Sequence, residues 1–260
     1  MNNSKTKKIV VSSMLGAITV ILGLTPLGFI PLGIINATTM HIPVIVGAIL
    51  EGPVVGASIG LIFGLSSFIK AFMSPTPISF VFYNPLISIL PRVLIGIVSY
   101  YVYAALADKD KKLLKIISYI LYPIFIIFLS YLLYQNIVSA HIFNAMLTTI
   151  FLITSIILAY ITYKSDYNNF AITASAFIGS MTNTVLVLGG IYLMYAQPYM
   201  EKIGKPIEQA KSTILGVSIT SGLPEAVICV LITTVVVNSV SKIKMDSAIY
   251  NEKKIKTITD

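Results

Sequence analysis

The sequence predicts an all-α polytopic membrane protein, and its composition and the length of its apolar runs predict this class. Hydrophobic residues make up 56% of the 260 residues and charged residues only 11%, whereas a soluble domain carries about 25% charged residues. The runs also lack the alternation of apolar and polar residues that a membrane β-barrel needs. No polar stretch of domain size separates them, so we expect one membrane domain over residues 1–260.

Apolar segments follow one another closely along the chain. They lie near residues 9–24, 39–50, 54–72, 85–106, 113–134, 141–163, 170–196 and 214–241. The basic start resembles a signal peptide, but it lacks an A-x-A cleavage site, so we expect a retained first helix. The second segment is too short to cross a ~30 Å hydrocarbon core alone. The turn Glu51-Gly52-Pro53 joins it to the third segment.

The net charge of +8 is explained by the positive-inside rule rather than by a nucleic-acid partner. Eight crossings place both termini on one side of the membrane. With the N-terminus inside, all lysines lie inside or at the inner interface except four, which are Lys70, Lys202, Lys205 and Lys211. We therefore expect both termini in the cytoplasm and a cytoplasmic tail over residues 242–260.

Two outer connections are candidates to cover a pocket. Residues 25–37 contain two prolines, two glycines and much apolar surface, so we expect them to fold back over a pocket mouth. Residues 73–84 mix proline with aromatic residues, which form either an interfacial belt or part of a lid. Thr38, Thr39 and His41 precede the short second segment, and this polar approach favours a cavity rather than a lipid contact.

Arg92 is the only arginine and lies within an apolar run. A guanidinium in hydrocarbon is costly and must face partners or a cavity. Its planar fork suits a carboxylate or phosphate. The structural alternative is a pair with Glu225 or with backbone carbonyls freed around Pro91. The sequence leaves both readings open.

Three further polar residues are candidates for the pocket. Asn183 lies in mid-helix, where asparagine has no easy bond back to its own helix, unlike threonine. Glu225 opens the last apolar run and either interacts with the helix dipole or accepts a bond from a substrate hydroxyl or amide. His41 either caps the short segment or binds a ligand.

Missing motifs exclude several classes of function. The chain has no G-x-x-x-x-G-K-[ST] loop to hydrolyse ATP and no H-E-x-x-H zinc motif. It also lacks a nucleophile–base pair, so we expect no enzyme, no cofactor and no metal. A cavity with few charges and no energy source of its own points to a binding subunit.

Four motifs occur together: ATTMHIPVIVGAILEGPVVGASIGLIFGLSSF, PRVLIG, GSMTNTVLVLGGIY and GLPEAVI. With them the sequence resembles the substrate-binding (S) subunits of energy-coupling factor (ECF) transporters, which take up vitamins in bacteria. The resemblance implies a six-helix core in the bacterial cell membrane, here residues 9–112 and 165–241. It also implies association with a transmembrane coupling subunit and two ATPases. The sequence departs from the family pattern in one respect, because residues 113–164 form an additional helical hairpin.

Small residues on the first helix recur as Ser12-x-x-x-Gly16 and Ser13-x-x-x-Ala17. This spacing allows close approach of another helix, either within the chain or from another subunit. The resemblance implies that Ser13 and Ala17 contact the coupling subunit.

One arginine with several neutral polar residues suits a small anionic vitamin, and pantothenate fits best. Folate or another vitamin, or a stand-alone secondary transporter, is the alternative. We expect Arg92 to pair with the carboxylate, and Asn183, Thr38 and Asn84 to bond the amide and hydroxyls. Glu225 and His41 are expected at the polar rim. Residues expected to close the mouth are Ile30, Phe80 and Tyr83.

Overall fold

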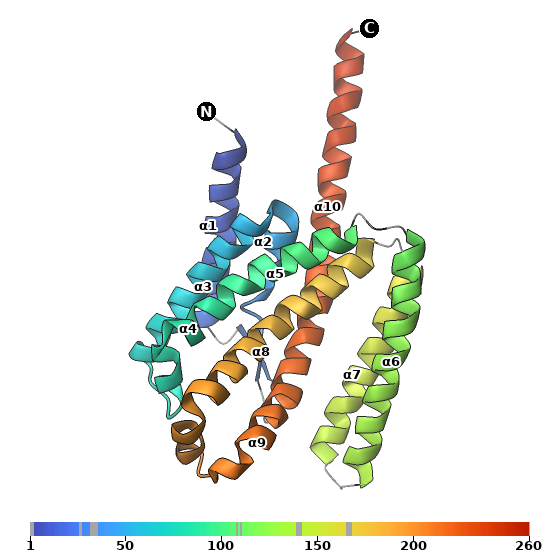
Figure 1. Ribbon diagram of the computed structural model, residues 1–260. Helices are drawn as coiled ribbons and strands as arrows, with labels where there is room; N and C mark the ends of the chain where they lie inside the picture. The colour runs from blue at the N-terminus through green and yellow to red at the C-terminus, as the bar shows by residue number, and fades with distance from the viewer. Residues whose placement is uncertain are drawn as a thin grey trace.

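The computed structural model describes residues 3–25, 28–31, 36–107, 109, 111–138, 142–164 and 168–259, and nearly all of them are helical (Figure 1). This confirms the predicted all-α polytopic class. The long helices are α1 (Asn3–Leu24), α3 (Pro53–Met73), α5 (Leu90–Ala107), α6 (Lys111–Val138), α7 (Ile142–Lys164), α8 (Asn168–Lys202) and α10 (Leu223–Thr259).

Short elements join the long helices. Three are short α-helices: α2 (Ile42–Glu51), α4 (Pro85–Ser88) and α9 (Ala210–Val217). Two are 3₁₀ turns, η2 (Ser79–Tyr83) and η3 (Ile207–Gln209), and η4 (Ser218–Gly222) is a turn of π-helix. Strands β1 (Phe29–Pro31) and β2 (Asn36–Thr38) pair antiparallel, with Phe29 opposite Thr38. The loop expected over residues 25–37 therefore contains a small β-hairpin; residues 26–27 and 32–35 lie outside the described chain.

Five stretches of the described chain are long and apolar enough to cross a membrane. They are Lys5–Leu24, Pro53–Met73, Pro85–Ala107, Phe170–Lys202 and Ile207–Ile243. Helix α2 has 10 residues, about 15 Å at 1.5 Å per residue, which is half of the hydrocarbon thickness. Helices α6 and α7, of 28 and 23 residues, form a hairpin beside the other helices in Figure 1. The N- and C-termini lie at the same end of the molecule.

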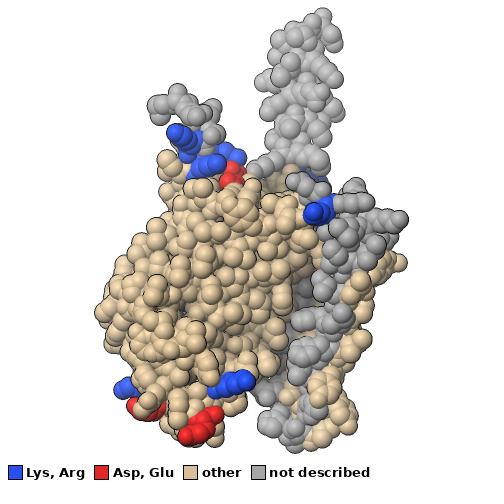
Figure 2. All heavy atoms as spheres, viewed as in Figure 1, with Lys and Arg blue, Asp and Glu red and all other residues tan. Residues whose placement is uncertain are grey.

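Charged side chains lie at the two ends of the face shown in Figure 2, and a wide uncharged band separates them. At the end that carries the termini, Lys7 Nζ lies 2.9 Å from Glu51 Oε1. This ion pair connects the start of α1 to the end of α2. The uncharged band and the long apolar helices show a multi-pass membrane protein.

The turn between α2 and α3 depends on one glycine and one proline. Gly52 has φ 102°, a left-handed conformation that a Cβ disfavours. Pro53 follows at the first turn of α3, where its missing N–H costs no helix bond. The two residues end α2 and reverse the chain, so α2 packs back against α3.

Helices α3 and α5 pack with their backbones nearly in contact. Gly56, Gly60 and Gly64 recur every fourth residue on α3, and a Cβ on Gly60 would collide with the Arg92 carbonyl on α5. A Cβ on Gly56 would lie 3.0 Å from the Gly96 Cα. This small-residue stripe allows the close approach that membrane helices use in place of a hydrophobic driving force. It fixes the position of the first turns of α5.

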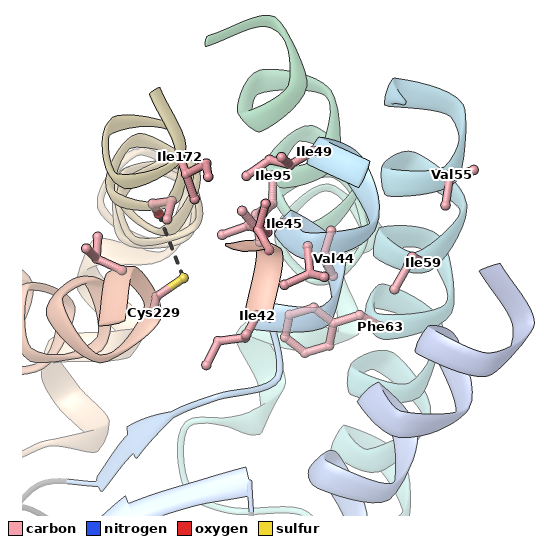
Figure 3. Packing of buried hydrophobic residues seen from close by; sticks show 14 residues of the cluster. Ile42, Val44, Ile45, Ile49, Val55, Ile59, Phe63, Ile95, Ile172 and Cys229 are labelled. Carbon is pink, nitrogen blue, oxygen red and sulfur yellow. Dashed lines mark hydrogen bonds between the residues drawn. The ribbon is translucent and has the colours of Figure 1, made fainter. Parts of the chain in front are cut away.

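Two hydrophobic clusters fill the interior. The first, which we call the α2 cluster, brings side chains from α3, α5, α8 and α10 together around α2 (Figure 3). Its labelled members in that view include Ile45, Ile59, Ile95 and Cys229. The second, the α9 cluster, lies around η2, α4, α9 and the end of α8. Its buried members are Val81, Ile87, Val187, Ile191, Tyr199, Met200, Ala210 and Ile214.

Candidate functional site

A layer of polar side chains separates the two clusters. On α8, Ala176 belongs to the α2 cluster and Val187 to the α9 cluster, and Ser180 and Asn183 lie between them. Consecutive turns of one helix thus pass from apolar to polar and back to apolar. Such an interruption in the core of a membrane protein is a place where polar groups must find partners.

The same order appears on other helices. Arg92 lies between Ile87 of the α9 cluster and Ile95 of the α2 cluster, and Glu225 begins the helix that later contributes Cys229 to the α2 cluster. We call these residues, with their neighbours before α2, the polar layer. Its members are Thr38, Thr39, His41, Arg92, Ser180, Asn183 and Glu225.

The Arg92 side chain, on α5, takes one partner from α4, across the break between the two helices. Pro91 has no N–H, so the carbonyl four residues before it, on Ile87, receives no helix bond from that residue. Arg92 Nη1 donates to this carbonyl oxygen at 2.5 Å. The sequence alternative of a carbonyl freed near Pro91 is therefore observed.

The rest of the guanidinium lies against aromatic rings. Its carbon lies over the rings of Phe63 and Phe82, 5.5 Å from each centroid. Arg92 is 6% exposed, and it forms no ion pair within 4 Å among the described residues. Glu225 interacts with it electrostatically, but the two do not form the ion pair that the sequence offered as one structural alternative. Most of the five N–H donors of the guanidinium therefore remain without a protein acceptor in the described chain.

Glu225 connects α10 to the β-hairpin through a hydrogen bond. Its Oε1 accepts a hydrogen bond from the Thr38 backbone N–H at 3.1 Å. The carboxylate lies in the first turn of α10, where the helix dipole favours a negative charge. Thr38 therefore contributes its backbone to the polar layer.

The π-turn η4 sets the position of Glu225. Pro224 cannot donate to a carbonyl of the preceding turn and its ring crowds that turn, and the chain widens so that Leu223 N–H donates to Ser218 O. Gly222 lies against Thr184 of α8, where a Cβ would be 2.5 Å from the threonine methyl group. π-turns of this kind occur frequently at functional sites.

His41 is buried at the start of α2 and bonded to α8. It is 1% exposed, and its Nε2 lies 3.1 Å from Ser180 Oγ. His41 lies at the N-cap position, but its side chain makes no cap bond. It is also close enough to Arg92 for an electrostatic interaction.

Unmet hydrogen-bonding capacity is concentrated in the polar layer. Four buried side-chain atoms there have no hydrogen-bond partner in the described structure: Thr39 Oγ1, His41 Nδ1, Arg92 Nε and Asn183 Oδ1. Leaving such an atom unpaired costs about 1–3 kcal/mol. These atoms come from α5, α8 and the approach to α2, so the layer is suited to bind one polar ligand through several elements.

Two predicted site residues have other contacts. Asn84 Oδ1 accepts from Leu86 N–H at 3.0 Å and caps α4, while its Nδ2 donates to Tyr195 Oη at 3.3 Å. Tyr83 is 39% exposed, and its ring stacks on Phe72 at 4.3 Å. Neither side chain forms a described contact with the polar layer.

Two of the residues expected at the mouth, Phe80 and Tyr83, lie in η2. The Phe80 ring makes an edge contact with Tyr195, 5.9 Å between centroids. The backbone of Ile30 belongs to β1, and its side chain lies outside the described part of the chain. Of the predicted lid, the structure describes two ring contacts: Phe80 with Tyr195, and Tyr83 with Phe72.

The small residues on α1 divide between two faces. Gly16 is buried against Ile62 of α3, where a Cβ would lie 2.5 Å from the isoleucine Cδ1. Ser13 and Ala17 are exposed on the outer face of α1. The first pair of small residues serves internal packing, and the second remains accessible to another subunit.

Sequence reasoning missed the two phenylalanines beside Arg92, and it missed Ser180. The glycine spacing on α3 predicts which face of that helix approaches another helix closely, and Phe63 lies one turn after Gly60 near that face. No local pattern marks Phe82. Ser180 lies one turn before Asn183, so helical spacing from a candidate residue could have found it.

The layer offers one cation, one carboxylate and neutral donors and acceptors. In the described chain, no group of three or more His, Cys, Asp or Glu side chains could hold a metal ion. These groups can form hydrogen bonds and ionic contacts.

Comparison with known proteins gives the family. A family model described as "ECF transporter, substrate-specific component" matches residues 7–151 and 120–237. The chain belongs to this family. It is thus an S component of a membrane transporter.

Two curated relatives of this S component are named pantothenate transporters. The pantothenic acid transporter PanT of Lactococcus lactis is 26% identical over 228 residues, which cover 82% of each chain. The pantothenate transporter PanT of Leuconostoc mesenteroides is 38% identical over 104 residues, which cover 38% of this chain and 51% of that protein.

Proposed function

We propose that this S component binds pantothenate from outside the cell and that partner subunits drive its uptake with ATP. The observation that carries the proposal is the buried Arg92 guanidinium, which lacks a carboxylate partner among the described residues. A buried charge is stable only when it is compensated. A substrate carboxylate would supply that compensation, and the names of the two relatives support pantothenate as its source.

The other groups of pantothenate have partners of the right kind. The molecule carries one carboxylate, one amide and two hydroxyls. Asn183 can bond the amide, while Thr39 and His41 offer polar atoms without protein partners. Glu225 uses one oxygen for Thr38, and its second oxygen can accept from a hydroxyl.

Folate is a weaker candidate for this site. It carries two carboxylates on its glutamate, whereas the described polar layer holds one cation, Arg92. We therefore expect pantothenate to displace bound radiolabelled pantothenate, and folate not to displace it.

The family supports a proposal for the partner subunits, and the lysines support a proposal for the orientation. We propose that a coupling subunit and two ATPases bind this chain, and that Ser13 and Ala17 on the outer face of α1 contact the coupling subunit. With the lysine-rich end inside, both termini lie in the cytoplasm and α9 lies outside.

Binding to the purified protein with Arg92→Gln tests the proposal. Loss of a charge-assisted bond costs about 1.5–3 kcal/mol, so we expect pantothenate affinity to fall about tenfold to 150-fold. Isothermal titration calorimetry measures the change. The control is Lys202→Gln, because Lys202 is exposed at the far end of α8 and its loss should leave affinity unchanged. A change of less than about threefold in Arg92→Gln would remove Arg92 from the site.

A further inference from the structure

Arg92 is stabilised without an ion pair to any residue that the structure describes. A buried arginine is ordinarily paired with a carboxylate, because an isolated buried charge is costly. Here the guanidinium lies over the two rings of Phe63 and Phe82. A ring face attracts a cation through its quadrupole and occupies none of the in-plane N–H donors. Aromatic contacts therefore stabilise the charge and leave its hydrogen-bonding edge for another partner.

The two rings come from different elements, and each element is itself fixed. Phe63 follows Gly60 by one turn on α3, and Gly60 holds the Arg92 backbone close to that helix. Phe82 lies in η2, which precedes the helix that supplies the Ile87 carbonyl. The Arg92 side chain is thus held by α3, η2 and α4 together.

We propose that Phe63 and Phe82 are positioning residues that keep the Arg92 fork charged, oriented and free of any protein carboxylate for the substrate. The inference rests on the proposed function and adds the means by which the site distinguishes a carboxylate from a neutral group. A protein carboxylate at this position would compete with the ligand for the same N–H donors. The rings avoid that competition.

Phe82→Leu is the variant of choice. Phe63 is 4% exposed and belongs to the α2 cluster, so its truncation also damages the core. Phe82 is only half-buried, and leucine keeps most of its apolar packing. Two ligands are compared: pantothenate, and panthenol, in which a CH₂OH group replaces the carboxylate.

We expect Phe82→Leu to lower pantothenate affinity about five- to thirty-fold, as for loss of a desolvated cation–π contact. Panthenol affinity should change less than about twofold, because its neutral end gains little from the charge. Phe68→Leu is the control, because Phe68 lies on α3 and contacts Phe72; it should bind both ligands as the parent does. Equal losses for both ligands, or no loss for either, would overturn the positioning role of Phe82.

A double-variant cycle separates this inference from the proposed function. If Phe82 acts through Arg92, Phe82→Leu lowers pantothenate affinity in the parent and has no further effect in Arg92→Gln. Additive losses would show that Phe82 is an ordinary wall of the pocket and would overturn the inference alone. If Arg92→Gln itself binds pantothenate as the parent does, the proposed role of Arg92 fails first.

Discussion

At the scale of single residues, Arg92 has the backbone partner that one of its two sequence readings predicts, and the anion of the other reading is our proposal. One N–H is used by the Ile87 carbonyl, which gives the side chain a structural anchor. The Nε atom is buried without a partner, and the rings of Phe63 and Phe82 stabilise the charge. A lone arginine in an apolar run predicts that partners exist. It does not predict rings at positions 63 and 82, because those contacts form only when the helices pack.

Gly60 lets α3 approach Arg92, and its replacement tests that contact. We expect Gly60→Ala to lower the free energy of unfolding by about 1–3 kcal/mol, because the new Cβ collides with the backbone of α5. Thermal unfolding in detergent measures the change. Gly189→Ala is the matched control, because no atom lies within 4 Å of a Cβ there. If both variants unfold at the same temperature as the parent, the close approach of α3 and α5 does not stabilise the fold.

Asn84, which is predicted to bond the substrate, caps the start of α4. Its sequence neighbour Pro85 gives an Asn-Pro pair, which is typical of a helix start. The structure has that cap and a second bond to Tyr195. The Asn-Pro pair that indicates a cap is visible in the sequence, but the aromatic residues of the same outer loop also fit a lid. His41, Asn183 and Glu225 carry no such local signal, and each contributes to the polar layer.

At the scale of elements, two proline-associated irregularities shape the site. Pro91 lies in the first turn of α5, where it leaves free the Ile87 carbonyl that binds Arg92. Pro224 follows the π-turn that positions Glu225. The prolines are visible in the sequence, and a freed carbonyl near Pro91 could be predicted from it. The β-hairpin and the π-turn could not, because both depend on contacts between distant segments, such as that between Thr38 and Glu225.

Replacing Pro91 tests the role of the first irregularity. In Pro91→Ala the new N–H can donate to the Ile87 carbonyl and competes with Arg92 for it. We expect thermal stability to be kept or raised, because Pro91 lies in the first turn of α5 and alanine supplies an N–H for the Ile87 carbonyl that proline lacks. Pantothenate affinity should fall roughly threefold to tenfold, the equivalent of one hydrogen bond of about 0.5–1.5 kcal/mol.

Pro85→Ala is the control for this experiment. Pro85 lies in the first turn of α4, where no helix bond is missing, so binding should be unchanged. Unaltered affinity in Pro91→Ala, measured by the same calorimetry, would show that the Ile87 carbonyl does not orient Arg92.

At the scale of the whole molecule, the interior is divided into two apolar clusters with the polar layer between them. The α2 cluster supports the layer on the side of the termini, and the α9 cluster closes it on the opposite side. Helix α2 makes this possible because it is only 10 residues long. Its polar approach is thereby placed in the interior rather than at a membrane surface. The sequence predicts that this segment is too short to cross the membrane alone and that the polar residues before it face a cavity.

The orientation that we propose for the molecule in the membrane rests on its lysines and can be tested with single cysteines. Cys229 is fully buried and should not react with a thiol reagent. Labelling therefore measures only the cysteine that is introduced. Lys8 and Lys205 are exposed and lie at opposite ends of the molecule. The positive-inside rule places Lys8 in the cytoplasm and Lys205 outside. In intact cells a membrane-impermeant maleimide should label Lys205→Cys at once and Lys8→Cys only after permeabilisation. The reverse pattern would place α9 in the cytoplasm, and the polar layer would then open on the wrong side for uptake.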